Sequence, residues 1–107
     1  MKKGMIKVSV FYPNIVGKAF DMDYYFTKHL PLVKQSLGSA LKFVSAEKGL
    51  AGAAPDSPAT YVVMGHLYFD SMESFQNSFG PQVEKLMADI KNFTSVEPVA
   101  QISEVLM

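Results

Sequence analysis

The order of apolar segments along the chain constrains its fold more than any other feature. Stretches rich in β-branched and aromatic residues predict four strands, over residues 5–12, 40–48, 60–69 and 97–106. Helical patterns over residues 21–38 and 70–90 follow the first and the third of these strands. This βαββαβ order is typical of the ferredoxin-like split βαβ arrangement. We therefore expect one α+β domain over residues 1–107, with an antiparallel four-stranded sheet and both helices on one face.

The other face of the predicted sheet leads to a prediction about oligomeric state. In the third strand, two largely apolar sets alternate: Thr60, Val62, Met64, His66 and Tyr68, and Tyr61, Val63, Gly65, Leu67 and Phe69. A sheet that is apolar on both faces needs cover on both. The two helices cover one face only. We therefore expect a homodimer in which two copies pack sheet on sheet around a two-fold axis.

Composition excludes several classes of function. Ten lysines balance ten acidic residues, and there is no arginine, so no basic surface for a nucleic acid is expected. The absence of cysteine excludes disulfides, thiolate nucleophiles and cysteine-based metal sites. Neither histidine has a further ligand at a metal-binding spacing, so no metal site is expected. No signal peptide or membrane-spanning run is apparent, which favours a cytoplasmic protein that does not bind membranes.

One segment combines a helical pattern with a costly proline. It covers residues 21–38, DMDYYFTKHLPLVKQSLG, and Pro31 follows His29 by two residues. A proline inside a helix removes a hydrogen bond and clashes with an earlier carbonyl, at about 3 kcal/mol. Tyr25 lies four residues before His29, so their side chains share one side of the helix. The chain accepts this cost beside one of its two histidines, which makes His29 the first candidate functional residue.

The two helices have predicted boundaries and core faces. Asp21 is expected to cap the first helix and Gly38 to end it. Asp70, three residues before Glu73, is expected to cap the second. The core-facing stripe of the first helix is expected to contain Met22, Phe26, Leu30, Val33 and Leu37. His29 lies beside this stripe, where it could face either the rim of a cleft or water.

The same segment resembles a known family. The run FDMDYYFTKHLPLV over residues 20–33 has an aromatic pair, a histidine and a proline in the pattern of the EthD family. The strand end Tyr12-Pro13 and the run YFDSMESF over residues 68–75 also match, so the resemblance spans nearly the whole chain. It implies a dimeric α+β barrel. The family takes its name from the degradation of ethyl tert-butyl ether, and similar barrels isomerise, dehydrate or oxygenate small organic molecules in a cleft between helices and sheet.

Residues near His29 suggest two functions for such a cleft. In the first, His29 acts as an acid–base residue with Tyr25 in support, and Tyr12 and Asn14 help to bind a small hydrophobic or aromatic carbonyl compound. This isomerase or dehydratase chemistry would need no cofactor. In the second, the cleft serves a non-catalytic ligand-binding or accessory protein in organic-compound degradation or secondary metabolism. A third interpretation is structural. His29 then only bonds to the backbone, or the whole domain serves as an assembly module.

The second histidine is expected to be separate from the first. If Leu67 and Phe69 face the helices, His66 faces away from them and cannot share a pocket with His29. We therefore expect His66 to be a hydrogen-bonded residue of the dimer interface. No Ser–His–Asp arrangement or phosphate-binding glycine loop is recognised in the sequence. Residues 49–59 are predicted to form a loop.

Overall fold

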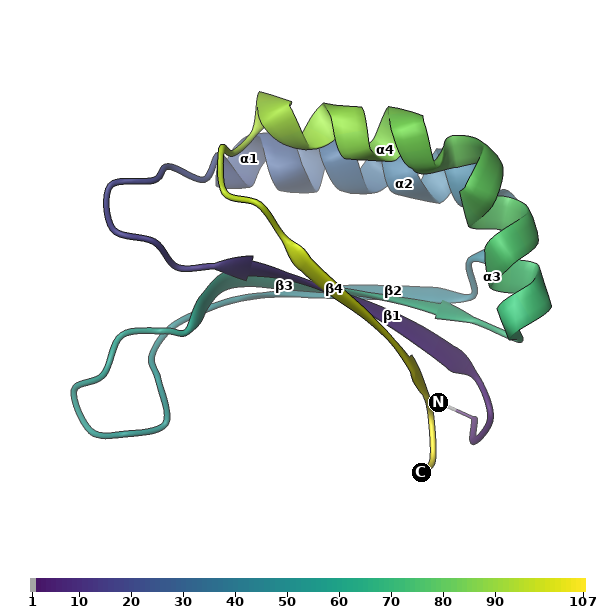
Figure 1. Ribbon diagram of the computed structural model, residues 1–107, viewed down its shortest axis with the longest axis horizontal. Coiled ribbons are helices and arrows are strands. Elements are labelled where there is room, and N and C mark those ends of the chain that lie inside the picture. The colour runs from purple at the N-terminus through teal and green to yellow at the C-terminus, as the bar shows by residue number, and fades with distance from the viewer. Residues whose placement is uncertain (1) are drawn as a thin grey trace.

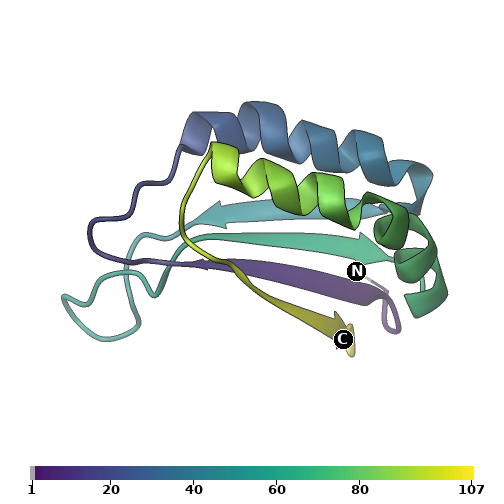
Figure 2. The same ribbon diagram turned by 45° about the horizontal axis from the view of Figure 1, so that its top comes forward.

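A computed structural model describes residues 2–107 as a sheet covered on one face by helices (Figure 1). The strands are β1 (Ile6–Pro13), β2 (Phe43–Lys48), β3 (Tyr61–Phe69) and β4 (Val99–Glu104). They are antiparallel and lie in the order β2-β3-β1-β4. The helices lie side by side over this sheet (Figure 2). The predicted ferredoxin-like α+β fold is confirmed.

The first helical run contains a wide turn around the candidate histidine. It consists of α1 (Met22–Tyr24), a π-helical turn (Tyr25–His29) and α2 (Leu30–Leu37). The Asp21 side chain accepts a hydrogen bond from the Tyr24 backbone and caps α1, as predicted. The backbone N–H of Leu30 reaches back five residues, to the carbonyl of Tyr25. The hydrogen bond that closes the π turn thus comes from the residue directly before Pro31, whose missing N–H would leave a regular helix without a bond anyway.

The π turn changes which side chains face the core. Phe26, expected inside, is 42% exposed, whereas the buried residues are Tyr25, His29, Val33 and Leu37, each four residues apart. Four residues advance a regular α-helix about 40° past a full turn, so a stripe with this spacing drifts around its surface. The wider π turn offsets much of that drift. The expectation that His29 lies beside the buried stripe is therefore wrong, because it assumed a regular α-helix.

The second helical run begins one residue later than predicted. It consists of α3 (Met72–Phe79), a 3₁₀ turn (Gly80–Gln82), α4 (Val83–Asp89) and a final 3₁₀ turn (Ile90–Asn92). The N-cap is Ser71, whose hydroxyl accepts a hydrogen bond from the backbone of Ser74. Asp70 is therefore not the cap. Its neighbour Ser71 has the extended backbone that a cap requires.

The buried core is divided into two clusters. One is aliphatic and aromatic: Ile6, Val8, Val33, Leu37, Leu67, Phe69, Phe75 and Leu86. The other consists mainly of aromatic residues: Tyr12, Tyr25, Val63 and Phe93. Between them, a row of small side chains crosses all four strands on the face toward the helices: Ala46, Gly65, Val10 and Ala100. Short side chains in this row leave space between the sheet and the helices.

The outer face of the sheet is more polar than predicted. Its central positions hold Lys7, Ser9, His66, Gln101 and Ser103, while Phe11, Met64 and Val99 form an apolar row beside them. The prediction of two apolar faces gave most weight to β3 and too little weight to the polar side chains that β1 and β4 place next to it.

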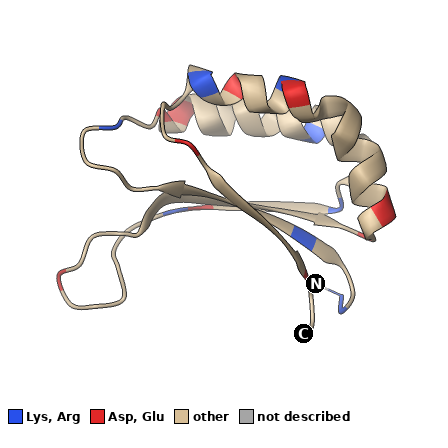
Figure 3. Ribbon diagram, viewed as in Figure 1, with Lys and Arg blue, Asp and Glu red and all other residues tan. Residues whose placement is uncertain are grey.

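Charged residues of both signs are spread over helices, loops and strands (Figure 3). Within residues 2–107, no helix has the length and apolar character needed to cross a bilayer.

Candidate functional site

His29 is held by a carboxylate from the other helical run. Its Nδ1 lies 2.8 Å from Oδ2 of Asp89, the last residue of α4. The two side chains are only 8% and 12% exposed. The Tyr24 hydroxyl donates to Oδ1 of Asp89 at 2.7 Å, and the Asn92 amide donates to the same oxygen at 3.0 Å. Both carboxylate oxygens of Asp89 therefore accept hydrogen bonds in this partly buried position.

These hydrogen bonds determine the ionisation of Asp89. Burial alone would raise the pKa of its carboxyl, but the donors Tyr24, His29 and Asn92 outweigh burial and lower that pKa. The hydrogen bond that Tyr24 donates to Asp89 also raises the pKa of the Tyr24 hydroxyl. An ionised Asp89 accepts a hydrogen bond from the protonated Nδ1 of His29. The neutral imidazole then has its lone pair on Nε2, the nitrogen left for a ligand.

Aromatic rings surround His29. The Tyr25 ring stacks on the imidazole with centroids 5.7 Å apart, and the Phe93 ring lies 4.7 Å from it. Tyr12 packs edge-to-face against Tyr25 at 5.9 Å. Burial raises the pKa of the Tyr25 hydroxyl to about 12, and it also raises the pKa of Tyr12. Both hydroxyls therefore remain protonated donors near neutral pH.

A cavity of about 270 Å³ lies between the helices and the sheet at this point. Its polar lining residues are His29, Tyr12, Tyr25 and His66, and most of the remaining lining is aliphatic or aromatic. Both ring nitrogens of His66 are used by hydrogen bonds to Ser9 and Glu47. Gly65 on β3 is essential to this geometry, because a Cβ there would lie 2.6 Å from the Tyr25 hydroxyl oxygen. The cavity thus combines an oriented imidazole with two phenol groups in otherwise apolar surroundings.

Comparison with known proteins places the chain in a family. The EthD domain matches residues 16–97. An EthD-like protein from Ralstonia eutropha JMP134 is 43% identical, with a TM-score of 0.91 over 99% of this chain and 96% of that one. The chain belongs to the EthD family. This result confirms the resemblance seen in the sequence.

More distant structures share only the fold with this EthD protein. Hydroxynitrile lyase from Passiflora edulis is 14% identical, with a TM-score of 0.69 over 97% of this chain and 95% of the lyase. A dimeric ferredoxin-like protein of unknown function from Thermobifida fusca YX is 17% identical. Its TM-score is 0.58, over 98% of this chain and 93% of that one.

The structure brings together three of the four site residues predicted from the sequence. His29, Tyr25 and Tyr12 all line the cavity of the EthD protein. Asn14 does not, because it lies exposed in the loop after β1 and its amide donates to the Ala59 carbonyl at 2.9 Å. This bond holds the loop against residues 49–59, which gives Asn14 a structural role. Its predicted part in ligand binding lacks geometric support.

Sequence reasoning missed Asp89, together with Tyr24 and Asn92. Asp89 is 60 residues from His29 in the chain, so no local motif connects them. One signal was present in the sequence. Asp89 ends a helix, where the helix dipole disfavours a negative charge unless another group compensates.

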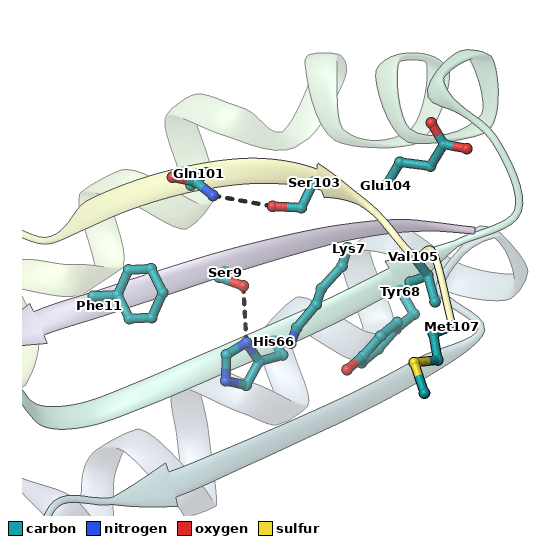
Figure 4. Close-up of a pocket in the computed structure, with 10 residues that line it drawn as sticks. All are labelled: Lys7, Ser9, Phe11, His66, Tyr68, Gln101, Ser103, Glu104, Val105 and Met107. Atoms are coloured by element: carbon teal, nitrogen blue, oxygen red, sulfur yellow. Dashed lines mark hydrogen bonds between the residues drawn. The ribbon is translucent and has the colours of Figure 1, made fainter. Parts of the chain in front are cut away.

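His66 lies on the opposite face of the sheet from His29, as predicted. Its Nδ1 is 2.9 Å from the Ser9 hydroxyl, and its Nε2 is 3.0 Å from Oε1 of Glu47. Figure 4 shows Ser9 and His66 in a hollow of about 590 Å³ on the outer face. The structure therefore contains a Ser–His–carboxylate chain, although none was recognised in the sequence.

This Ser–His–carboxylate arrangement lacks the surroundings of a nucleophilic triad. Ser9 and His66 lie in the middle of paired strands, where backbone N–H groups bond to neighbouring strands and cannot form an oxyanion hole. The bonds instead satisfy polar groups that are nearly buried. Among residues 2–107, no group of three or more histidine, aspartate or glutamate side chains could hold a metal ion.

Proposed function

We propose that this EthD protein is a cofactor-independent enzyme that moves a proton next to the carbonyl group of a small hydrophobic or aromatic compound. Such chemistry covers isomerases and dehydratase-type enzymes. One observation carries the proposal: His29 bonds to Asp89 through Nδ1 and also lines an apolar cavity that contains the Tyr25 and Tyr12 side chains. A base, a proton donor and apolar surroundings are what enolisation of a ketone requires.

The residues have defined roles in this proposal. Nε2 of His29 takes a proton from the carbon beside the carbonyl, the C–H electron pair forms the carbon–carbon double bond of the enolate, and the C=O π pair moves onto the oxygen. The carbonyl oxygen becomes negatively charged and accepts a hydrogen bond from the Tyr25 hydroxyl, which stays protonated because its pKa is raised to about 12. Asp89 stabilises the imidazolium through Nδ1. Return of the proton to a different atom gives an isomer.

Deuterium uptake tests the proposal without knowledge of the natural substrate. Cyclohexanone and 2-tetralone are incubated with the protein in D₂O, and loss of the proton signals beside the carbonyl is followed by NMR. We expect the wild type to accelerate exchange and His29→Gln to lose about 10²–10⁴ of that acceleration while it still binds the ketones. Equal exchange by wild type and His29→Gln would show that His29 is not the base.

A second candidate is a ligand-binding or accessory protein that uses the same cavity. It is supported by the predominance of apolar side chains in the lining, which is typical of sites that bind small molecules. Thermal-shift or NMR binding of the ketones by wild type, with no acceleration of exchange, would favour this candidate. Binding together with exchange favours the enzyme.

We also propose that two copies pair through the outer face of the sheet. Support comes from the exposed apolar side chains Phe43 and Val99 on the edge strands, which are 49% and 55% exposed. The similar protein from Thermobifida fusca is described as dimeric. Size-exclusion chromatography with light scattering at micromolar concentration is expected to give twice the chain mass. A monomer under these conditions would contradict the pairing.

A further inference from the structure

The floor of the cavity is a slot that runs across the strands. Gly65, Val10 and Ala100 are cross-strand partners on β3, β1 and β4, and all three line the cavity. The rows on either side carry larger residues, with Tyr12 on one side and Leu67 and Ile102 on the other. Adjacent strands lie about 4.8 Å apart, so the slot extends about 10 Å from β3 to β4.

One end of the slot is closed and polar. The Tyr25 hydroxyl lies directly over Gly65, where even a methyl group would collide with it. His29 stacks on the Tyr25 ring and belongs to the same cavity lining. The Tyr25 hydroxyl and His29 therefore place hydrogen-bonding groups toward the β3 end of the slot.

The other end of the slot lies at an edge strand and is open. Ala100 of β4 is exposed, and beside it Ile102 is 48% exposed. Met87 of α4 is 50% exposed and lines the same cavity from above. Apolar side chains that remain half exposed around a cavity mouth are typical of a place where apolar ligands enter.

We propose that the ligand is a flat, fused-ring carbonyl compound that enters over β4, between Met87 and Ala100, and lies across the strands. Its oxygen reaches Tyr25 and His29, and its second ring covers Val10 and Ala100. This inference rests on the proposed function, since it assigns the access route and the substrate shape for the same cavity. Ala100 is then a specificity-determining residue, because its small side chain leaves room for the second ring.

Two ketones and a matched pair of variants test the inference. The dissociation constants of 2-tetralone, with two fused rings, and cyclohexanone, with one, are measured by NMR titration. Ala100→Phe fills the mouth, whereas Ala88→Phe adds the same side chain at an exposed position of α4 that does not line the cavity. We expect Ala100→Phe to weaken 2-tetralone at least about tenfold and cyclohexanone by no more than about twofold. Ala88→Phe should change neither.

Several results would overturn the inference. Equal weakening of both ketones by Ala100→Phe, or no weakening of either, would show that the second ring does not lie over β4. Failure of wild type to bind 2-tetralone would exclude fused-ring ligands. If Ala100→Phe does not fold, Met87→Trp narrows the same mouth from the helix side and must show the same selectivity for the larger ketone.

The proposed function can fail separately. Binding that follows the expected pattern without deuterium exchange would leave the access route and ligand shape in place and remove the enzymatic role. Exchange that depends on His29 but not on Ala100 would keep the enzyme and overturn the slot.

Discussion

The two histidines are both nearly buried and both bonded to a carboxylate, yet their surroundings differ. His29 uses one nitrogen for Asp89, whose side chain is 12% exposed, and its ring faces a cavity. His66 uses both nitrogens, one for Ser9 and one for Glu47, whose side chain is 48% exposed. A carboxylate partner therefore does not identify a catalytic histidine. Both histidines border a hollow, so the discriminating feature is a second ring nitrogen left for a ligand.

The largest expected effect separates the two histidines directly. His66→Gln is expected to change the ketone exchange rate by no more than about twofold, against the loss of about 10²–10⁴ for His29→Gln. The reason is that the His66 side chain lies on the other side of the sheet from His29. NMR of deuterium uptake measures both variants. A larger loss for His66→Gln would break the distinction.

The carboxylate partners provide the next comparison. In Asp89→Asn the amide oxygen is kept by the donors Tyr24 and Asn92, so the amide NH₂ faces Nδ1 of His29. This donor moves the imidazole proton to Nε2 and removes the base. We expect exchange to slow by about 10²-fold and its pH profile to change, while the similar Glu47→Gln leaves both unchanged. A general loss of stability would lower the exchange rate without altering the pH profile.

Gly65 precedes His66 in β3 but faces the opposite side of the sheet. Gly65→Ala is expected to destabilise the protein by about 1–3 kcal/mol, because the new Cβ would overlap the Tyr25 hydroxyl. Adding Tyr25→Phe removes that oxygen and should recover most of the loss. Urea unfolding measures the free energies. Gly80→Ala is the control, since the space around Gly80 is open and its backbone is helical.

Alkaline pH should lower the free energy of unfolding through the buried Tyr25. The pKa of Tyr25 is about 10 in the unfolded chain and is raised to about 12 in the folded protein. Its contribution to the free energy of unfolding is therefore complete below a pH of about 10 and is lost as the pH rises toward 12. This tyrosine alone lowers the free energy of unfolding by about 1.4 kcal/mol per pH unit in that window. Tyr25→Phe should flatten the decline in denaturant unfolding between these pH values. An unchanged slope would contradict the assignment.

The smallest expected effect concerns two serines. Ser9→Ala removes the hydrogen bond to Nδ1 of His66 and should cost about 1 kcal/mol of unfolding free energy. Ser36 has a buried hydroxyl oxygen with no partner among residues 2–107, so Ser36→Ala should be neutral or slightly stabilising. Thermal unfolding compares the two. Equal losses would show that the bond to His66 adds nothing.

The sequence was sufficient for the fold because its signals are local. Alternating strands, the Asp21 cap and the stop at Gly38 each depend on neighbouring residues, and the βαββαβ order then restricts the topology. The partner of His29 depends on how the two helical runs pack, so Asp89 could not be found from spacing. The polarity of the outer face likewise depends on which strands lie beside β3, and β1 and β4 contribute Lys7 and Gln101 there.

The π turn adds a consequence for how such a site can change. The π turn, which ends just before α2, contains about one residue more than a regular α-helix would use for the same rotation. Removal of one residue there, such as the exposed Lys28, would therefore leave a regular α-helical turn of about the same rotation. Tyr25 would then lie three residues before the histidine instead of four, which changes how the two rings stack, although no side chain at the site had been replaced. In this helix, a change in length can therefore alter the chemistry as effectively as a substitution.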